Sequence, residues 1–148
     1  MKYGTYQLLQ ASADLCIFHF ISIGPNGNVI KQLAFQETTI PGIYNLCLSD
    51  ISETGDSDVG KVTNNKDRNL VLATVADIVG IYLERNPNQW ILIEGSTSSR
   101  TRLYRMAIGI NFEELSARFD IYTQRDGKLI PFKKNMPAEN FIICLKNI

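Results

Sequence analysis

The feature that most constrains the fold is the segment from Asp67 to Asn86, in which apolar residues cover most of a helical surface. They recur three and four residues apart, along two adjoining stripes of the predicted helix. The stripes contain Val71, Val75, Ile78 and Tyr82, and beside them Leu72, Ala76, Val79 and Leu83. So wide an apolar surface must be buried, and we therefore expect this helix to pack against a sheet.

The chain before this helix is predicted to form strands. From Leu15 to Phe35, a period-two pattern rich in β-forming residues surrounds Gly24-Pro25-Asn26-Gly27, which is typical of a hairpin with a tight turn. Another strand is expected from Ile43 to Leu48, and a short leading strand within Met1–Leu9. The N-terminal part of the chain is therefore predicted to be a small antiparallel sheet.

The chain after the helix alternates between strands and a second helix. A short apolar run from Gln89 to Glu94 predicts a buried strand. The second helix is expected from about Arg100 to Gly109, and Asn111 is expected to cap a continuation of it through Ala117. A second hairpin is predicted from Phe119 to Phe132, with the turn Arg125-Asp126-Gly127-Lys128.

The elements follow the order β-β-β-α-β-α-β-β-β and end with a strand from Phe141 to Leu145. Strands gather at both ends of the chain, which indicates an α+β fold. We expect a mainly antiparallel sheet, formed by the N-terminal and C-terminal hairpins and packed against two central helices. A chain of 148 residues is one domain by its size, so this domain is expected to span residues 1–148.

The charge balance limits the partners of this domain. Lys plus Arg and Asp plus Glu both number 15, so the net charge is zero. Binding along a nucleic-acid backbone needs a positive field, so a nucleic acid is a possible partner that the composition does not favour. We expect no membrane contact, because no stretch approaches the length of a membrane span. The N-terminus lacks the pattern of a secretory signal, and we expect a cytoplasmic protein.

Cysteine and histidine residues predict neither a metal site nor a cofactor. Cys16, Cys47 and Cys144 each stand in an apolar run, as reduced thiols in a core do. The single histidine, His19, lies in the middle of a predicted strand without a nucleophile motif beside it. A structural role is expected for all four side chains.

The first candidate site is the run from Gly95 to Arg105, where a buried strand leads into a helix through a loop of small residues. The N-terminus of a helix attracts anions, and arginine binds phosphate or carboxylate in a planar fork. The candidate ligand-binding residues here are Ser96, Ser98, Arg100, Arg102, Tyr104 and Arg105. In the structural alternative, Ser98 or Ser99 caps the helix, and the arginines are solvated or pair with Glu94, Glu113 and Glu114.

The second candidate site is the polar run from Asn64 to Asn69, at the start of the first helix. Asn64, Asn65 and Asp67 are its candidate ligand-binding residues. Helix starts can converge on one rim of a sheet, so this run and the Gly95 loop are hypothesised to face one cleft. The alternative is an elaborate helix cap with a solvated turn.

The third candidate lies in a predicted surface loop from Ser49 to Lys66, which has lost the apolar pattern. Its acidic residues are Asp50, Glu53, Asp56 and Asp58. Paired carboxylates can hold magnesium or act as acid and base, but nothing in their spacing selects that use. A solvated loop is the alternative.

Several segments carry a resemblance to a known family. They include Phe20-Ile21-Ser22-Ile23-Gly24-Pro25-Asn26-Gly27, Asn64-Asn65-Lys66-Asp67 and Arg100-Thr101-Arg102-Leu103-Tyr104-Arg105. In these segments the chain is similar to a family of small uncharacterised proteins from Bacteroidetes. That family has no assigned activity, so the resemblance implies no reaction.

The leading functional hypothesis is a binding or interaction module that recognises a partner protein or an anionic ligand. Its rim would consist of Asn64–Asp67 and Gly95–Arg105. One alternative is a small toxin-like nuclease or nucleotide-modifying enzyme, with Asp56, Asp58 or Asp67 as base or metal ligand and Arg100 and Arg102 on a phosphate. Another alternative is a structural protein that forms homo-oligomers. The sequence favours the non-enzymatic hypotheses.

Overall fold

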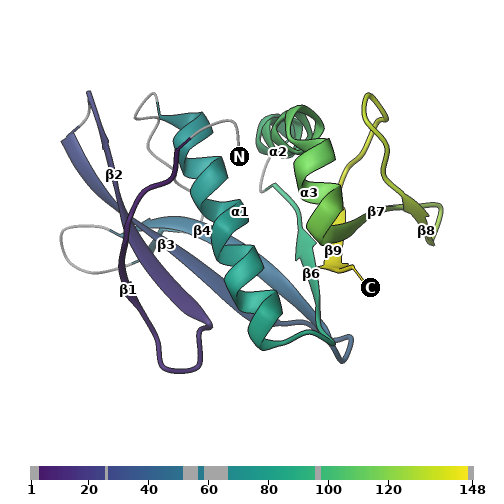
Figure 1. Cartoon of the computed structure of the whole chain (residues 1–148), viewed down its shortest axis with the longest axis horizontal. Helices are drawn as coiled ribbons and strands as arrows, with labels where there is room; N and C mark the ends of the chain where they lie inside the picture. Colours follow the sequence, from purple (N-terminus) through teal and green to yellow (C-terminus); the bar gives the residue numbers. More distant parts are fainter. Residues whose placement is uncertain (1–3, 26, 52–56, 59–66, 96–97, 147–148) are drawn as a thin grey trace. The chain divides into compact units, whose positions relative to one another are not determined.

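The fold is described from a computed structural model of the chain, which covers residues 4–25, 27–51, 57–58, 67–95 and 98–146. Strands lie at both ends of the chain and helices between them (Figure 1). The strands are β1 (Leu8–Ala11), β2 (Ile17–Gly24), β3 (Gly27–Glu37), β4 (Ile43–Ile51), β5 (Ser57–Asp58), β6 (Trp90–Ile93), β7 (Phe119–Arg125), β8 (Lys128–Pro131) and β9 (Phe141–Leu145). The helices are α1 (Arg68–Arg85), α2 (Ser98–Ile110) and α3 (Phe112–Arg118). The predicted α+β class is confirmed.

Contacts within the chain divide it into two compact units. The N-terminal unit comprises Tyr3–Gln36 and Leu46–Tyr82. The C-terminal unit comprises Met1–Lys2, Glu37–Asn45 and Leu83–Ile148. Strand β4 begins in the C-terminal unit and ends in the N-terminal unit, so each unit has its own sheet segment and its own core.

The strands of the N-terminal unit follow the hydrogen-bonded order β1-β2-β3-β4. The hairpin of β2 and β3 is antiparallel and closes at the pair Gly24 and Gly27, as the turn sequence predicted. Gly27 has a φ of 86°, a conformation that residues with a side chain rarely adopt. Strand β1 is also antiparallel to β2 and begins at Leu8, so the leading strand expected within Met1–Leu9 lies further along the chain.

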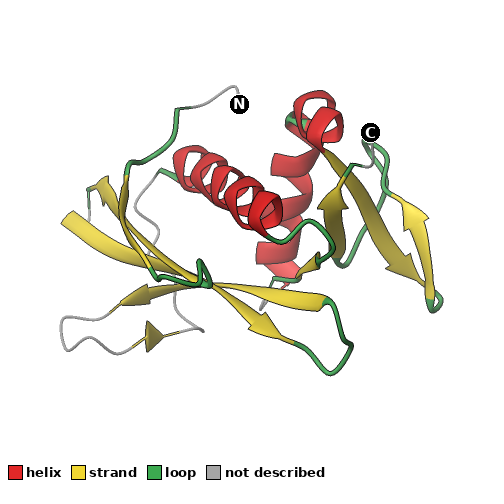
Figure 2. Ribbon diagram, turned by 60° about the horizontal axis from the view of Figure 1, so that its bottom comes forward, coloured by secondary structure: helices red, strands yellow, loops and turns green. Residues whose placement is uncertain are grey.

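Helix α1 covers one face of these strands (Figure 2). The even-numbered residues of β2, including Phe18 and Phe20, point into the core below the helix. The ring of Tyr82 stacks on Phe35 with 4.0 Å between the centroids. Leu83, the last member of its stripe, is fully buried. The prediction of a buried helix packed on a sheet is therefore confirmed.

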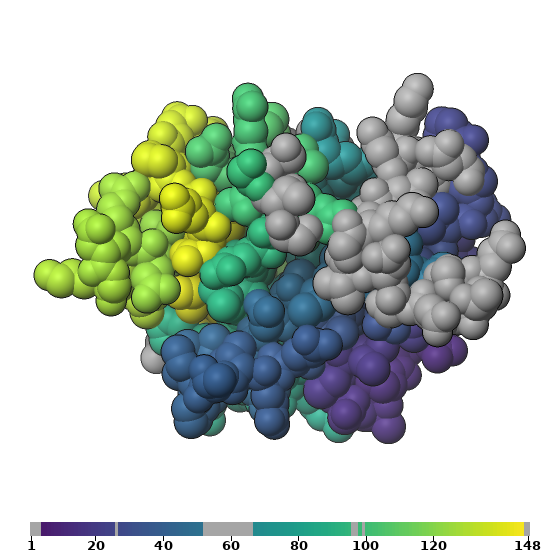
Figure 3. All heavy atoms as spheres, turned by 180° about the vertical axis from the view of Figure 1, so that it is seen from behind, coloured from purple at the N-terminus to yellow at the C-terminus, as the bar shows by residue number. Residues whose placement is uncertain are grey.

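The strands of the C-terminal unit follow the order β4-β6-β9-β7-β8. The pair of β4 and β6 is parallel, while β6 with β9, β9 with β7 and β7 with β8 are antiparallel. Asp126 and Gly127 have φ angles of 53° and 76°, which are those of a tight hairpin turn. In Figure 3 the yellow atoms of the C-terminal segment lie next to the yellow-green atoms of this hairpin.

The core of the C-terminal unit is built from aromatic and branched residues on β6, β7 and β9. Phe132, which directly follows β8, packs edge-on against Phe141 with 5.1 Å between the ring centroids. Helix α3 contacts both α2 and β7. No helix in the described part of the chain is long and apolar enough to cross a membrane.

The predicted second helix is divided in two. Helix α2 ends at Ile110 and α3 begins at Phe112, with Asn111 between them. Asn111 stands at the cap position, but its side chain does not cap α3: the Nδ2 amide donates to the Ala107 carbonyl, 2.9 Å away, within α2. The expected continuation through Ala117 is confirmed as α3, whose first backbone hydrogen bond runs from the Leu115 N–H to the Asn111 carbonyl. Only the expected cap by the Asn111 side chain is wrong.

The predicted surface loop from Ser49 to Lys66 begins later than expected. Strand β4 continues to Ile51, and Ser49 and Asp50 are buried. Residues 57–58 form β5, which is antiparallel to the end of β4. The rest of the predicted loop lies outside the described residues.

Candidate functional site

The predicted site residues belong to both units. Asp67 directly precedes α1 in the N-terminal unit, whereas Ser98, Arg100, Arg102, Tyr104 and Arg105 lie on α2 in the C-terminal unit. Asn64, Asn65 and Ser96 lie outside the described residues. The hypothesis that the two runs share one cleft stays a prediction.

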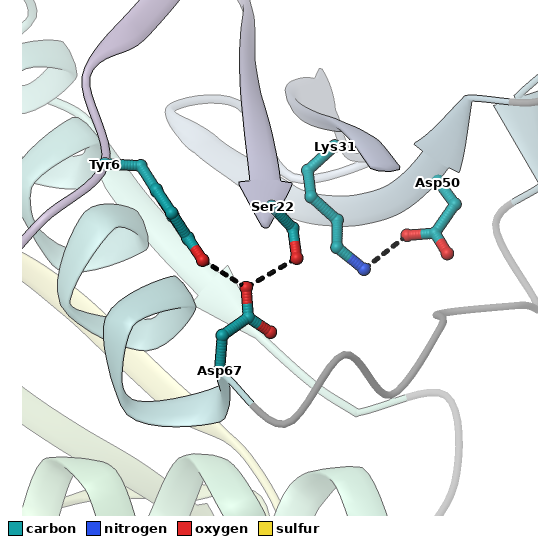
Figure 4. Close-up of polar contacts among 5 residues, drawn as sticks. All are labelled: Tyr6, Ser22, Lys31, Asp50 and Asp67. Atoms are coloured by element: carbon teal, nitrogen blue, oxygen red, sulfur yellow. Dashed lines mark hydrogen bonds and ion pairs between the residues drawn. The ribbon is translucent and has the colours of Figure 1, made fainter. Parts of the chain in front are cut away.

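The carboxylate of Asp67 is held by two hydroxyl groups (Figure 4). Its Oδ2 accepts a hydrogen bond from the Tyr6 hydroxyl at 2.6 Å and another from Ser22 Oγ at 2.5 Å. The Tyr6 hydroxyl also accepts a hydrogen bond from the N–H of Ile23, 3.1 Å away. These contacts connect the segment before β1, the end of β2 and the start of α1.

The backbone of Tyr6 forms a further hydrogen bond, and partial burial affects the pKa of its hydroxyl. Its N–H donates to Thr74 Oγ1 at 2.8 Å, and this hydroxyl donates to the Leu70 carbonyl at 2.7 Å. Burial, and then the hydrogen bond to Asp67, raise the pKa of the Tyr6 hydroxyl above its ordinary value. Tyr6 is therefore a neutral donor at physiological pH, and its contact with Asp67 joins parts of the fold.

A buried ion pair lies on the inner face of the same sheet (Figure 4). Lys31 Nζ is 2.6 Å from Asp50 Oδ1, and the two side chains are 1% and 10% exposed. Successive residues of β3 point to opposite faces of the sheet, so Lys31 shares the inner face with the buried Leu33 and Phe35. This pattern in the sequence indicates that Lys31 is buried. A cation at a core position requires an anionic partner. Lys31 was not among the residues predicted from the sequence.

The burial of Asp50 corrects the third candidate site. Asp50 is not part of a solvated acidic loop, because β4 carries it into the core to meet Lys31. Asp58 belongs to β5, opposite Asp50, and Glu53 and Asp56 lie outside the described residues. Within the part of the chain that is described, no three His, Cys, Asp or Glu side chains form a potential metal site.

The turn before α2 requires glycine at position 95. A Cβ at Gly95 would lie 2.3 Å from the backbone nitrogen of Thr101, closer than real contacts come. The Gly95 N–H donates to Thr101 Oγ1 at 3.2 Å, so the incoming chain lies against the first turn of the helix. Helix α2 begins at Ser98, two residues before the expected start at about Arg100. The expected cap by Ser98 or Ser99 stays a prediction.

One face of α2 continues from the arginines into apolar residues. Arg102 and Arg105 are three positions apart, and Met106, Gly109 and Ile110 follow at helical spacing. Arg102 is exposed and Arg105 is partly exposed. Met106 and Ile110 are 43% and 41% exposed, although both are large and apolar.

This face of α2 forms one wall of a groove of about 460 Å³. The lining residues are Arg105, Met106, Gly109, Ile110, Phe132, Lys134, Asn135, Met136 and Pro137. The second wall is a turn after β8, in which the Met136 N–H donates to the Lys133 carbonyl and Asn135 has a φ of 69°. Arg125 Nη2 donates to the Pro137 carbonyl at 3.1 Å, so the wall is tied to the β7–β8 hairpin.

A comparison with protein-family models identifies the family of this chain. The model of a family of unknown function, DUF6934, matches residues 2–146. The chain belongs to DUF6934. Neither the comparison with curated proteins nor the comparison with solved structures finds a match. The resemblance to a family without an assigned activity is thereby confirmed.

In this DUF6934 chain, His19 and the cysteines have structural surroundings. His19 Nε2 is 3.0 Å from Gln32 Oε1 on the neighbouring strand. Cys144 is buried, but Cys16 and Cys47 are only half-buried, so the expectation of three core thiols holds for one of them. Burial raises the pKa of the Cys47 and Cys144 thiols, which makes both poor nucleophiles at neutral pH.

Proposed function

We propose that this protein is a binding module whose groove between α2 and the turn after β8 accepts a partner with both negative charge and apolar surface. The observation that carries the proposal is the joint presence of Arg105 and Lys134 with uncovered apolar side chains in the lining. Concave sites of several hundred Å³ with a few placed polar groups are typical of binding sites. The proposal develops the predicted anion-binding rim, in which Arg105 was already a candidate.

The two kinds of lining residue have separate parts in such binding. Met106 and Ile110 gain free energy when a partner removes them from water, at roughly 25 cal/mol per Å² of apolar surface. Arg105 and Lys134 contribute orientation and a preference for anions, since exposed ion pairs add only about 0–1 kcal/mol each. Arg102, exposed one turn before Met106, extends the positive edge.

A matched pair of fluorescent probes tests the proposal. Anilinonaphthalene sulfonate is apolar and anionic, and N-phenylnaphthylamine is a similar ring system without the sulfonate. We expect the sulfonate to bind saturably and to bind about three- to tenfold more weakly when Arg105→Gln and Lys134→Gln are combined. Binding of the neutral probe should be the same in the variant, and salt should weaken only the sulfonate.

Lys128→Gln is the control, because Lys128 is an exposed cation on β8 that is not among the groove residues. Near-ultraviolet circular dichroism establishes that each variant keeps its packed core, since loosely packed states also bind the sulfonate. Equal affinity of the sulfonate for the wild type and the double variant would refute the proposal.

The proposal includes action in the cytoplasm and the Bacteroidetes origin that the family resemblance implies. It is supported by the cysteines, because Cys16, Cys47 and Cys144 are not joined in disulfide bonds, as is usual in a reducing compartment. A reporter fused to the protein in a bacterial host, read out in each compartment, tests this location.

The predicted alternative of a nuclease or nucleotide-modifying enzyme depends mainly on Asp67 among the described residues. Asp67 Oδ2 already accepts hydrogen bonds from Tyr6 and Ser22, so a catalytic carboxylate would have to exchange these contacts for substrate. Toxicity on expression that Asp67→Ala relieves, with unchanged protein levels, would favour the enzyme over the binding module. The oligomer alternative is tested by measuring the mass of the protein in solution.

A further inference from the structure

We infer that the natural occupant of this groove is a short segment of a partner protein that carries carboxylates beside bulky apolar side chains. The inference rests on the proposed function and adds the chemical class of the partner. It follows from the shape of the apolar floor, the number and position of the cations and the absence of exposed aromatic rings in the described lining.

The apolar lining is suited to side chains of a peptide. Met106 and Ile110 stand one helical turn apart on α2, and Met136 lies on the opposite wall. Methionine side chains are flexible and polarisable, so they adapt to different aliphatic or aromatic anchors. Phe132 closes the floor and is itself only 2% exposed, because it packs against Phe112 and Phe141.

The cations select an acidic segment. Arg105 belongs to one wall of the groove and Lys134 to the other, so an occupant meets a positive charge on each side. The guanidinium of Arg105 can bind a carboxylate with two parallel hydrogen bonds, whereas Lys134 acts as a point charge. Lys133 and Arg102 are also exposed, and each is close in sequence to one of these two cations.

The same lining argues against a nucleic acid. Proteins that bind single strands offer exposed aromatic rings on which bases stack, and a row of cations along the backbone. Among the described lining residues the only aromatic ring is that of Phe132, which is only 2% exposed. Two cations at the groove match two carboxylates better than a run of phosphates.

The volume also favours a short segment over a folded surface. A groove of about 460 Å³ is within the range of sites that enclose a small ligand, so it holds a few side chains. The wall after β8 is held by the bonds of Arg125 and Met136, so the groove is present before a partner arrives. A preformed groove reduces the ordering cost of binding.

The test selects peptides and then locates them. A random-peptide library displayed on phage is selected on the full-length wild-type protein at low salt. The selected peptides are titrated into protein with isotope-labelled methionine methyl groups, and Met106→Leu and Met136→Leu assign the two groove signals. We expect sequences rich in Asp or Glu beside Leu, Ile, Met or Phe that shift both signals and displace anilinonaphthalene sulfonate.

The matched variants then measure the charge contribution. The selected peptides should bind about tenfold more weakly to the Arg105→Gln, Lys134→Gln double variant, and with unchanged affinity to Lys128→Gln. Peptides without acidic enrichment, or peptides that leave both methyl signals in place, would overturn the inference.

Other occupants give different results. A short single-stranded RNA or inorganic pyrophosphate that shifts the two methyl signals more strongly than the peptides would overturn the inference and leave the proposed function standing. Methyl shifts that grow with protein concentration alone would assign the groove to a second copy of the chain, with the same consequence. If anilinonaphthalene sulfonate itself ignores Arg105 and Lys134, the proposed function fails as well.

Discussion

The start of α1 and the polar face of α2 both carry charged side chains, yet these side chains are used differently. Before α1, the carboxylate of Asp67 contacts Tyr6 and Ser22 of the same unit, so it holds segments of the fold together. On α2, Arg105 lies at a groove with apolar side chains that the described chain leaves partly uncovered. A charged residue in a polar run therefore does not reveal whether it serves the fold or a ligand.

The difference has a physical cause. A buried polar group is stable only with partners, so each one specifies a second residue elsewhere in the chain. An exposed cation is already stabilised by water and specifies nothing about the fold. Substitutions near α1 should consequently change stability, and those on the α2 face should change binding.

The largest effect is expected at the buried pair of the N-terminal unit. Lys31→Met leaves Asp50 charged and without its cation in the core, and we expect a loss of about 3–5 kcal/mol in the free energy of unfolding. Urea denaturation measures it. Combining Lys31→Met with Asp50→Leu should recover most of the loss, because two apolar residues replace two charges. A Lys31→Met protein as stable as the wild type would contradict the fold-holding role of this unit's polar residues.

Substitutions at the turn before α2 test whether this part of the C-terminal unit is required for stability. Gly95→Ala places a methyl group against the Thr101 backbone, and we expect a loss of about 1–3 kcal/mol from the forced shift. Gly109→Ala, within α2, is the control, because an added Cβ at this position meets nothing within 4 Å. It should stabilise the protein by about 0.5–1 kcal/mol. Equal effects of the two substitutions would show that the close approach is unimportant.

A smaller loss is expected at the hydroxyl that binds Asp67. Tyr6→Phe keeps the ring, which stacks on Phe20, and removes the hydrogen bond to the carboxylate. We expect a loss of about 1.5 kcal/mol, as for a hydrogen bond to a charged group. Thermal and urea unfolding measure it. If Tyr6→Phe left stability unchanged, the contact would be incidental to the fold.

Alkaline pH sharpens the same prediction. The pKa of Tyr6 is raised in the folded protein, so the folded state favours the neutral hydroxyl. The associated stability is present below the unfolded pKa and is lost as pH rises through the folded pKa. The free energy of unfolding should therefore decline more steeply above about pH 10 in the wild type than in Tyr6→Phe. Tyr122, whose pKa is raised by burial, contributes equally to both proteins.

The smallest change in stability is expected on the α2 face. Arg105→Gln should alter the free energy of unfolding by no more than about 0.5 kcal/mol, because the side chain is partly exposed. The same substitution should weaken binding of anilinonaphthalene sulfonate by roughly threefold. A large loss of stability with unchanged probe binding would reverse the comparison between Asp67 and Arg105.

Most of the secondary structure was predictable because it depends on local patterns. A few neighbouring residues are enough to predict the conformation of α1, of the turn at Gly27 and of the turn at Asp126-Gly127. The break at Asn111 was predictable as a helix cap, but the contact of its side-chain amide was not, since the amide bonds backward to Ala107. The end of β4 was misplaced for a similar reason: Asp50 reads as loop until Lys31 is known to meet it.

Only the charged residues of the candidate site could be predicted from the sequence. Arg105 and its spacing from Arg102 are visible in the sequence, and so is the run of cations at Lys133 and Lys134. Nothing in the sequence places the turn after β8 opposite α2, because that placement depends on how Phe132 packs on Phe112 and Phe141. The groove is a product of that packing.

The sequence by itself determined the α+β class, the buried helix and the turns, since each follows from short-range periodicity and backbone preference. Only the tertiary structure decided which polar residues face inward: Lys31 and Asp50 are buried together, and Asp67 is bound by two hydroxyls. It also left Met106 and Ile110 partly uncovered beside Arg105. Whether a polar or apolar side chain finds a partner depends on residues far away in the chain, and that information appears only when the chain is folded.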